Sequence, residues 1–144
     1  MIKYIQTIIL ISLLSCGGGK ETIQITLNCN ENTNSGNAVV ITLYQLINSD
    51  KFRLSSFEYL TKNPGATLGT DLVTNSELER TMVPGEALEL NEIEIKQESA
   101  FIGIIADFHS PAPDGWQAVI PITEDLKQLV IFVHENSISV QKED

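Results

Sequence analysis

Two histidines and a nearby aspartate are the residues whose types could support metal chemistry. Asp107 and His109 are separated by one residue, so on an extended strand both side chains would face the same side and could share a metal ion. Zinc sites use three or four protein ligands, and two ligands at one spacing are a weak signal. His134 ends an apolar run beside a turn, which favours a surface or packing position. We therefore predict no metal site, and we interpret Asp107 and His109 as a strand end that runs into a solvated loop.

The sequence also lacks the patterns of nucleophilic and phosphate-binding sites. No nucleophile-elbow sequence marks a serine. Gly17-Gly18-Gly19-Lys20 lacks both the preceding strand and the following Ser or Thr of a phosphate loop. A glutamate-rich segment lacks the Asp/Asn alternation of a calcium loop and favours a charged strand edge: Glu86, Glu89, Glu92, Glu94 and Glu98. We predict no catalytic residue, no enzyme activity and no cofactor.

Charge and length restrict the class of partner. The chain has 144 residues and a formal net charge of −10 at pH 7. Such acidity argues against binding to nucleic acid and to anionic lipid headgroups. The length fits a single domain, which buries roughly two-thirds of the surface of its unfolded chain. The two cysteines are Cys16 and Cys29, so a lipid on Cys16 would leave no internal disulfide.

The N-terminal segment indicates an anchor. The apolar run Tyr4–Leu14 would cover as a helix only roughly half of a ~30 Å hydrocarbon core, and with Lys3 before it the run is typical of a signal peptide. It ends in Leu13-Leu14-Ser15-Cys16, which resembles the lipobox of bacterial lipoproteins. A signal peptide with an incidental cysteine is the alternative. We expect a signal peptide at 1–15, a cysteine carrying covalent lipid such as palmitate with a flexible tether at 16–21, and one domain at 22–144. Two or more acyl chains anchor stably, since each buried CH₂ contributes roughly 0.8 kcal/mol.

Most of the remaining chain has the patterns of β-strands. Residues 22–28 alternate apolar and polar side chains, as a strand with one buried face does. The runs 38–46 and 100–108 are apolar on both faces, which predicts central strands. Four further strands are expected near 78–83, 116–123, 128–134 and 137–141. In the strand near 86–96 the apolar phase slips by one residue at Asn91-Glu92, which predicts a bulge.

One segment between the early strands has helical signals. Ser55 and Glu58 have the spacing of a capping box, and Asn63-Pro64-Gly65 favours a helix end. We predict one short helix near 56–62, while residues 66–77 leave room for a further helical turn. Short strands at regular spacing with this insertion predict an all-β fold, a β-sandwich. Trp116 is expected to pack on a sheet.

Several short segments occur in the same order as in a known protein family. After the lipobox come ITLN at 25–28, VITLYQL at 40–46, FRLSSFEYL at 52–60, LGTDL at 68–72, Pro84-Gly85, FIGIIADF at 101–108 and Trp116. This series resembles the outer-membrane lipoprotein of bacterial type VI secretion systems, the TssJ family. His109 and Gln117 stand where family members often carry basic residues. The resemblance implies a transthyretin-like sandwich with a helical insertion.

The resemblance also implies a scaffold on the periplasmic face of the outer membrane. Such a lipoprotein binds the periplasmic domain of the inner-membrane protein TssM through the loop between its first two strands. Here that loop comprises Asn30, Glu31, Asn32, Thr33, Asn34, Ser35, Gly36 and Asn37. Its single charge means that hydrogen bonds would dominate the contact, and a plain surface loop is the alternative.

Two other functions are compatible with the sequence. The first is a lipid-anchored periplasmic or surface module that captures a small ligand or saccharide on an exposed aromatic such as Trp116. The second is a metal-dependent hydrolase built on Asp107 and His109. The scaffold is our leading hypothesis, with no small-molecule substrate expected.

Overall fold

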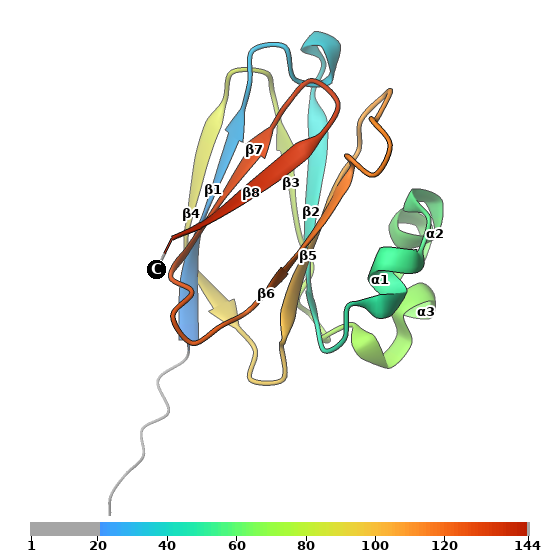
Figure 1. Cartoon of the computed structure of the whole chain (residues 1–144), viewed down its shortest axis with the longest axis vertical. Coiled ribbons are helices and arrows are strands. Elements are labelled where there is room, and N and C mark those ends of the chain that lie inside the picture. The colour runs from blue at the N-terminus through green and yellow to red at the C-terminus, as the bar shows by residue number, and fades with distance from the viewer. Residues whose placement is uncertain (1–20, 144) are drawn as a thin grey trace, which may run out of the picture.

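The computed structural model describes residues 21–143, which form two four-stranded sheets packed face to face (Figure 1). One sheet has the strand order β4-β1-β7-β8 and the other has the order β3-β2-β5-β6. The strands are β1 Glu21–Cys29, β2 Val39–Leu46, β3 Leu78–Met82, β4 Ala87–Ile95, β5 Phe101–Ala106, β6 Gln117–Pro121, β7 Gln128–Val133 and β8 Ile138–Glu143. The all-β sandwich expected from the sequence is confirmed.

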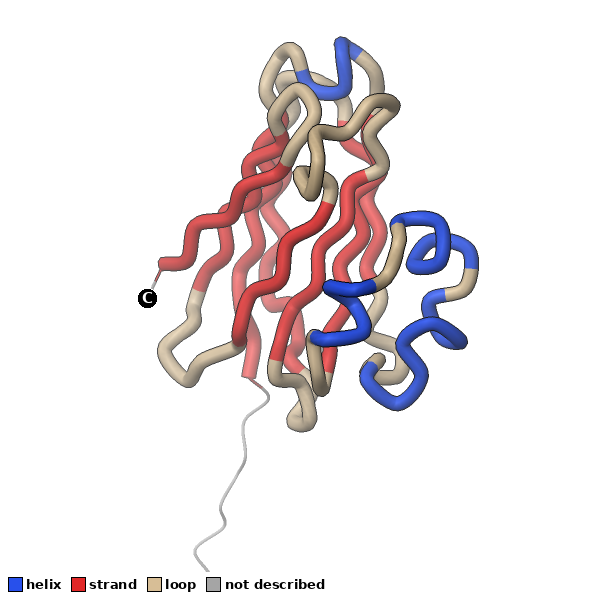
Figure 2. The backbone as a smooth tube through the Cα atoms, turned by 45° about the vertical axis from the view of Figure 1, so that its right-hand side comes forward, coloured by secondary structure: helices blue, strands red, loops and turns tan. Residues whose placement is uncertain are grey.

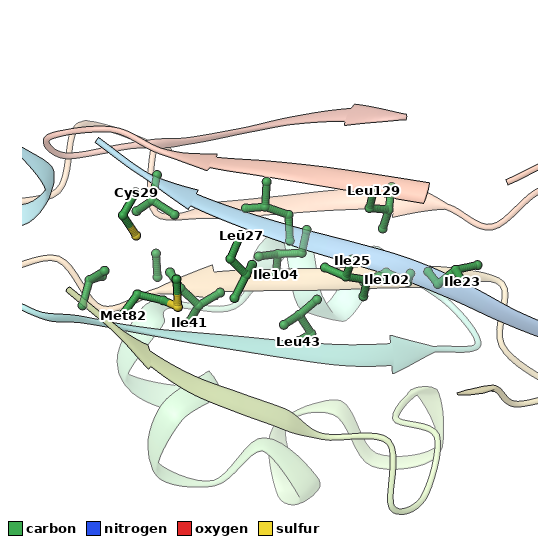
Figure 3. Packing of buried hydrophobic residues seen from close by; sticks show 14 of the residues in the cluster. Ile23, Ile25, Leu27, Cys29, Ile41, Leu43, Met82, Ile102, Ile104 and Leu129 are labelled. Carbon is green, nitrogen blue, oxygen red and sulfur yellow. The ribbon is translucent and has the colours of Figure 1, made fainter. Parts of the chain in front are cut away.

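The central strands carry the core. β1 lies between β4, to which it is antiparallel, and β7, to which it is parallel. Its alternating Ile23, Ile25 and Leu27 point between the sheets, where they meet Ile41 and Ile104 of the other sheet (Figure 3). β2 and β5 are central in their sheet, as their apolar runs predicted.

The expected bulge in β4 is present. Ile23 pairs with Ile93 and Ile25 pairs with Leu90, so β4 has one extra residue where β1 advances by two. Glu92 takes up this residue with a φ of 56°. Because β4 is an edge strand, its glutamates lie on a sheet edge, as predicted, where charge discourages edge-to-edge pairing.

The connection between β2 and β3 contains more helix than the sequence indicated. It holds α1 Asp50–Leu54, α2 Phe57–Lys62, α3 Pro64–Leu68 and the 3₁₀ turn η2 Gly69–Asp71, beside one face of the sandwich (Figure 2). The helix expected near 56–62 is α2, and α3 with η2 fills part of the segment left open. α1 was missed. None of the helices in residues 21–143 is long and apolar enough to cross a membrane.

The capping-box prediction was wrong by one residue. Ser56 is the N-cap of α2, with its Oγ accepting a hydrogen bond from the Tyr59 N–H at 3.5 Å. Ser55 instead closes the end of α1, since its Oγ donates to the Lys51 carbonyl at 2.6 Å. Because α1 was not expected, the sequence pattern gave no reason to reserve Ser55 for it.

A second apolar cluster attaches the helices to the sheet. Phe52, Leu60 and Leu68 are fully buried and cover the outer face of β2 and β5, where Tyr44 and Ile105 lie. Both clusters are formed by residues within 21–143, so the described part of the chain contains two apolar cores of its own.

Candidate partner-binding loop

Four connections meet at one end of the sandwich (Figure 1). The strand directions bring together the β1–β2 loop at 30–38, the β3–β4 turn at 83–86, the β5–β6 loop at 107–116 and the β7–β8 turn at 134–137. The chain enters β1 at Glu21, at the opposite end. The loop singled out from the sequence is therefore part of a larger surface that faces away from the entry point of the chain.

Thr33 fastens the β1–β2 loop to β7. Its side chain is fully buried, and its Oγ1 donates a hydrogen bond to the Val133 carbonyl at 2.7 Å. The Asn30 N–H donates to the same carbonyl at 3.0 Å. The carbonyl at the end of β7 is thereby used twice to hold one loop.

Asn34 joins three of the four connections. Its side chain is buried, its Nδ2 donates to the Ala38 carbonyl at 2.7 Å, and its Oδ1 accepts from the His109 N–H at 2.8 Å. Its own N–H donates to the Glu135 carbonyl at 2.8 Å. These bonds tie the β1–β2 loop to the β5–β6 loop and to the β7–β8 turn.

The loop backbone has an unusual shape over the 3₁₀ turn η1 Thr33–Gly36. Asn34, Ser35 and Gly36 follow one another with φ angles of 49°, 53° and 83°. Asn and Gly tolerate the left-handed region, and the bonds of Asn34 supply the energy that holds Ser35 there. Asn37 closes the turn, because both its N–H and its Nδ2 donate to the Asn34 carbonyl at 3.1 Å. The loop is preorganised.

The eight loop residues divide into supports and exposed groups. Thr33 and Asn34 are buried supports, whereas the exposed members are Asn30, Glu31, Asn32, Ser35, Gly36 and Asn37. Val83, in the neighbouring turn, is 51% exposed and adds an apolar side chain that the sequence did not single out. The link between loop and turn is the Gly85 N–H, which donates to the Asn30 carbonyl at 3.1 Å.

The histidines and the tryptophan considered as candidate site residues take part in hydrogen bonds and packing within the fold. The backbone N–H of His109 is engaged by Asn34, and within residues 21–143 no group of three His, Cys, Asp or Glu side chains could hold a metal ion. His134 is hydrogen-bonded at both ring nitrogens, to Asn30 Nδ2 at 3.2 Å and to Ser139 Oγ at 2.8 Å. Trp116 is half-buried and packs against both apolar clusters, as expected for a core or sheet-packing residue, and its ring lies edge-on to Phe57 of α2. Cys16 lies outside the described residues.

Cys29 lies beneath the loop as a packing residue. Burial, reinforced by the charge of Glu86 and opposed by a hydrogen bond with Thr33, raises the pKa of the thiol to about 11. Thiolate is the reactive form of cysteine, so this neutral, buried thiol is inert at neutral pH.

The two sheets and the fastened loops at one end define a small β-sandwich domain. Residues 21–141 match the family described as "Type VI secretion lipoprotein, VasD, EvfM, TssJ". The chain belongs to this family of type VI secretion lipoproteins, which is not a family of enzymes. The resemblance seen in the sequence is confirmed.

Solved structures share the fold. The type VI lipoprotein TssJ1 from Pseudomonas aeruginosa is 21% identical with a TM-score of 0.79, covering 88% of this chain and 98% of that one. Serratia marcescens Lip, a membrane-bound component of the type VI secretion system, is 15% identical with a TM-score of 0.75, covering 88% and 99%. A structure described as the TssM C-terminal domain (869–1107) from EAEC matches at 18% identity and a TM-score of 0.68, covering 83% and 97%. At such identities the likeness shows the fold. No curated protein sequence matches the chain.

Proposed function

We propose that this lipoprotein is a scaffold of a type VI secretion membrane complex that holds the periplasmic domain of a TssM-like inner-membrane protein at its loop end. The observation that carries the proposal is the β1–β2 loop, fixed in one shape by Thr33 and Asn34 and opposite to the entry of the chain at Glu21. A loop that is ordered before binding loses little conformational freedom on association. Family membership and the similar fold in a structure described as a TssM domain support this partner.

The geometry suits a protein anchored by its N-terminus. β1 has nine residues, which at about 3.3 Å per residue separate its two ends by roughly 30 Å. A lipid on Cys16 at the periplasmic face of the outer membrane would leave the loop end directed towards the inner membrane. In this proposal residues 1–15 are removed as a signal peptide and residues 16–21 form the tether.

The anchor has a direct test. Cys16→Ala should move the protein from the membrane fraction to the soluble fraction of the periplasm without lowering its melting temperature, because Cys16 precedes the domain expected at 22–144. Retention of the variant in the membrane fraction would refute the anchor.

The contact is proposed to combine amide hydrogen bonds with a small apolar centre. Asn32 and Ser35 present polar groups, and Val83 presents a side chain that loses water on binding. Because Thr33 and Asn34 are buried, they act in this proposal by holding the loop rather than by touching the partner.

Single substitutions test the contact better than a deletion of residues 31–36, which would also remove the two buried supports. Asn32→Arg and Val83→Asp are each expected to weaken binding of residues 21–144 to a TssM periplasmic fragment at least tenfold. Gln97→Arg is the matched control, since Gln97 is exposed in the β4–β5 turn at the opposite end. Equal affinities for all three variants, with unchanged melting temperatures, would exclude this loop end as the contact.

A further inference from the structure

A cleft lies on the outer face of the second sheet, and it reaches the loop end at Asp107, the first residue of the β5–β6 loop. Its volume is about 230 Å³. Alternate residues of β2 form its floor, and Phe57 and Thr61 of α2 form one wall. The helices lie beside this face of the sandwich in Figure 2. The lining comprises Val40, Thr42, Tyr44, Phe57, Thr61, Glu77, Glu79, Ile105 and Asp107.

The register explains why three carboxylates meet there. Glu79 is the pairing partner of Thr42, and Glu77 lies two residues earlier on the same face. Asp107 follows β5, and its N–H donates to the Val40 carbonyl at 2.9 Å. Within the described residues none of the three carboxylates has a hydrogen bond or an ion pair, and no basic residue lines the cleft.

A hydroxyl on the floor of the cleft has no partner within the described residues. Thr42 is only 5% exposed and lines the cleft, and no hydrogen bond in residues 21–143 engages its hydroxyl. The oxygen is open to the cleft rather than enclosed, so a ligand in the cleft can bond to it. An N–H donor entering the cleft would supply such a bond.

The cleft is aromatic as well as acidic. Tyr44 and Phe57 line it, and aromatic faces attract cations. Burial, reinforced by Glu77 and Glu79, raises the pKa of Tyr44 to about 12. The negative potential that keeps this phenol protonated would stabilise a cation in the same place.

Size and geometry restrict the cation. The volume is below the roughly 300–1,000 Å³ of pockets that enclose drug-sized ligands, so the cleft suits a single side chain. The carboxylates are not arranged around one point as metal ligands are. Guanidinium is planar, stacks on aromatic rings and donates five N–H groups, which matches an aromatic floor, several carboxylates and a free hydroxyl.

We propose that this cleft is a second interaction site that receives an arginine side chain from a protein partner. The site stands on its own geometry and does not depend on the contact proposed for the β1–β2 loop. Arginine is favoured over a free polyamine because a planar guanidinium can stack on an aromatic ring and bond to carboxylates and a hydroxyl at once, whereas an ammonium is a compact point charge.

The probe is the peptide acetyl-Gly-Arg-Gly-amide, titrated into residues 21–144 and followed by the backbone amide shifts of Thr42, Thr61 and Ile105. We expect a saturable shift at these amides. The same peptide with citrulline, which has nearly the shape of arginine but no charge, should bind at least tenfold more weakly. Equal binding of the two peptides, or no binding, would overturn the proposal.

Variants and a rival ligand complete the test. The double substitution E77Q/E79Q should weaken the arginine peptide about tenfold, whereas E89Q/E92Q, with the same loss of charge on the β4 edge, should leave it unchanged. T42V should weaken it without altering the melting temperature. Spermidine binding tighter than the arginine peptide would overturn the assignment to a protein side chain. This experiment does not measure binding to a TssM fragment. A negative result for the arginine site and a negative result for the loop contact can therefore be told apart.

Discussion

Asn34→Ala is the substitution that most directly tests whether the β1–β2 loop is held in shape. The alanine removes the donor to the Ala38 carbonyl and the acceptor of the His109 N–H. It also places an alanine at a φ of 49°, where a β-carbon is unfavourable. The change touches neither of the two apolar clusters.

The expected cost follows from these three losses. Each side-chain hydrogen bond contributes about 1 kcal/mol, and the left-handed conformation costs alanine about 1 kcal/mol more. Because Ala38 and His109 are exposed, water can replace the lost partners, so the free energy of unfolding should fall by about 2–3 kcal/mol. At about 4 °C per kcal/mol for a domain of this size, the melting temperature should fall by about 8–12 °C.

Urea unfolding, followed by the fluorescence of the single tryptophan, measures this loss. Asn34→Gly is the matched control, because it loses the same two hydrogen bonds but tolerates the left-handed conformation. It should be about 1 kcal/mol more stable than Asn34→Ala. Hydrogen exchange at the His109 amide should accelerate in both variants, since its acceptor is gone.

Surface substitutions usually change the free energy of unfolding by less than about 0.5 kcal/mol. If Asn34→Ala changes it by no more than that, and hydrogen exchange at the His109 amide is unchanged, then Asn34 does not fasten the loop. The preorganised contact proposed for TssM would then lose its basis.

Three further outcomes follow from the structure. Gly103→Ala should lower the free energy of unfolding by about 1–3 kcal/mol in thermal unfolding, because its β-carbon would lie 2.7 Å from the Phe52 ring; a neutral result would mean that α1 is loosely packed. In a Cys16→Ala chain, Cys29 should react with a thiol reagent at pH 8 more slowly than free cysteine, because burial raises its pKa to about 11. Denaturant should restore the reaction rate, whereas rapid reaction in the folded state would contradict the burial of Cys29. Folding raises the pKa of Tyr44 from 10.0 to about 12, so the folded state holds the phenol proton more tightly than the unfolded state does. The resulting contribution to the free energy of unfolding should decline as the pH rises from 10 towards 12. Tyr44→Phe should lack this part of the pH dependence when its unfolding is measured over the same pH range.

The sequence predicted the sandwich because its main signals are local. The alternation from Ile23 to Leu27 and the apolar runs of β2 and β5 reflect which faces are buried, and burial is expressed residue by residue along a strand. The bulge at Glu92 was visible for the same reason, as a change of phase between Leu90 and Ile93. The end of α2 was likewise marked by proline.

The missed features depend on neighbours that are distant in the chain. α1 has only five residues, too few to show a period, and Phe52 is buried because Gly103 leaves room for its ring. The cleft was invisible because its carboxylates come from β3 and from the end of β5, which only the sheet register brings together.

The β1–β2 loop shows most clearly why support and contact could not be separated from sequence. Asparagine is favoured in exposed turns and also tolerates left-handed positions, where its side chain can bond to the backbone. Asn34 differs from Asn32 because its Oδ1 meets the N–H of His109, 75 positions away, and its own N–H meets the Glu135 carbonyl. A polar loop on a sandwich therefore divides according to which of its side chains meet backbone groups of the adjacent connections. Those that do fix the shape of the surface, and those that do not are free to bind a partner.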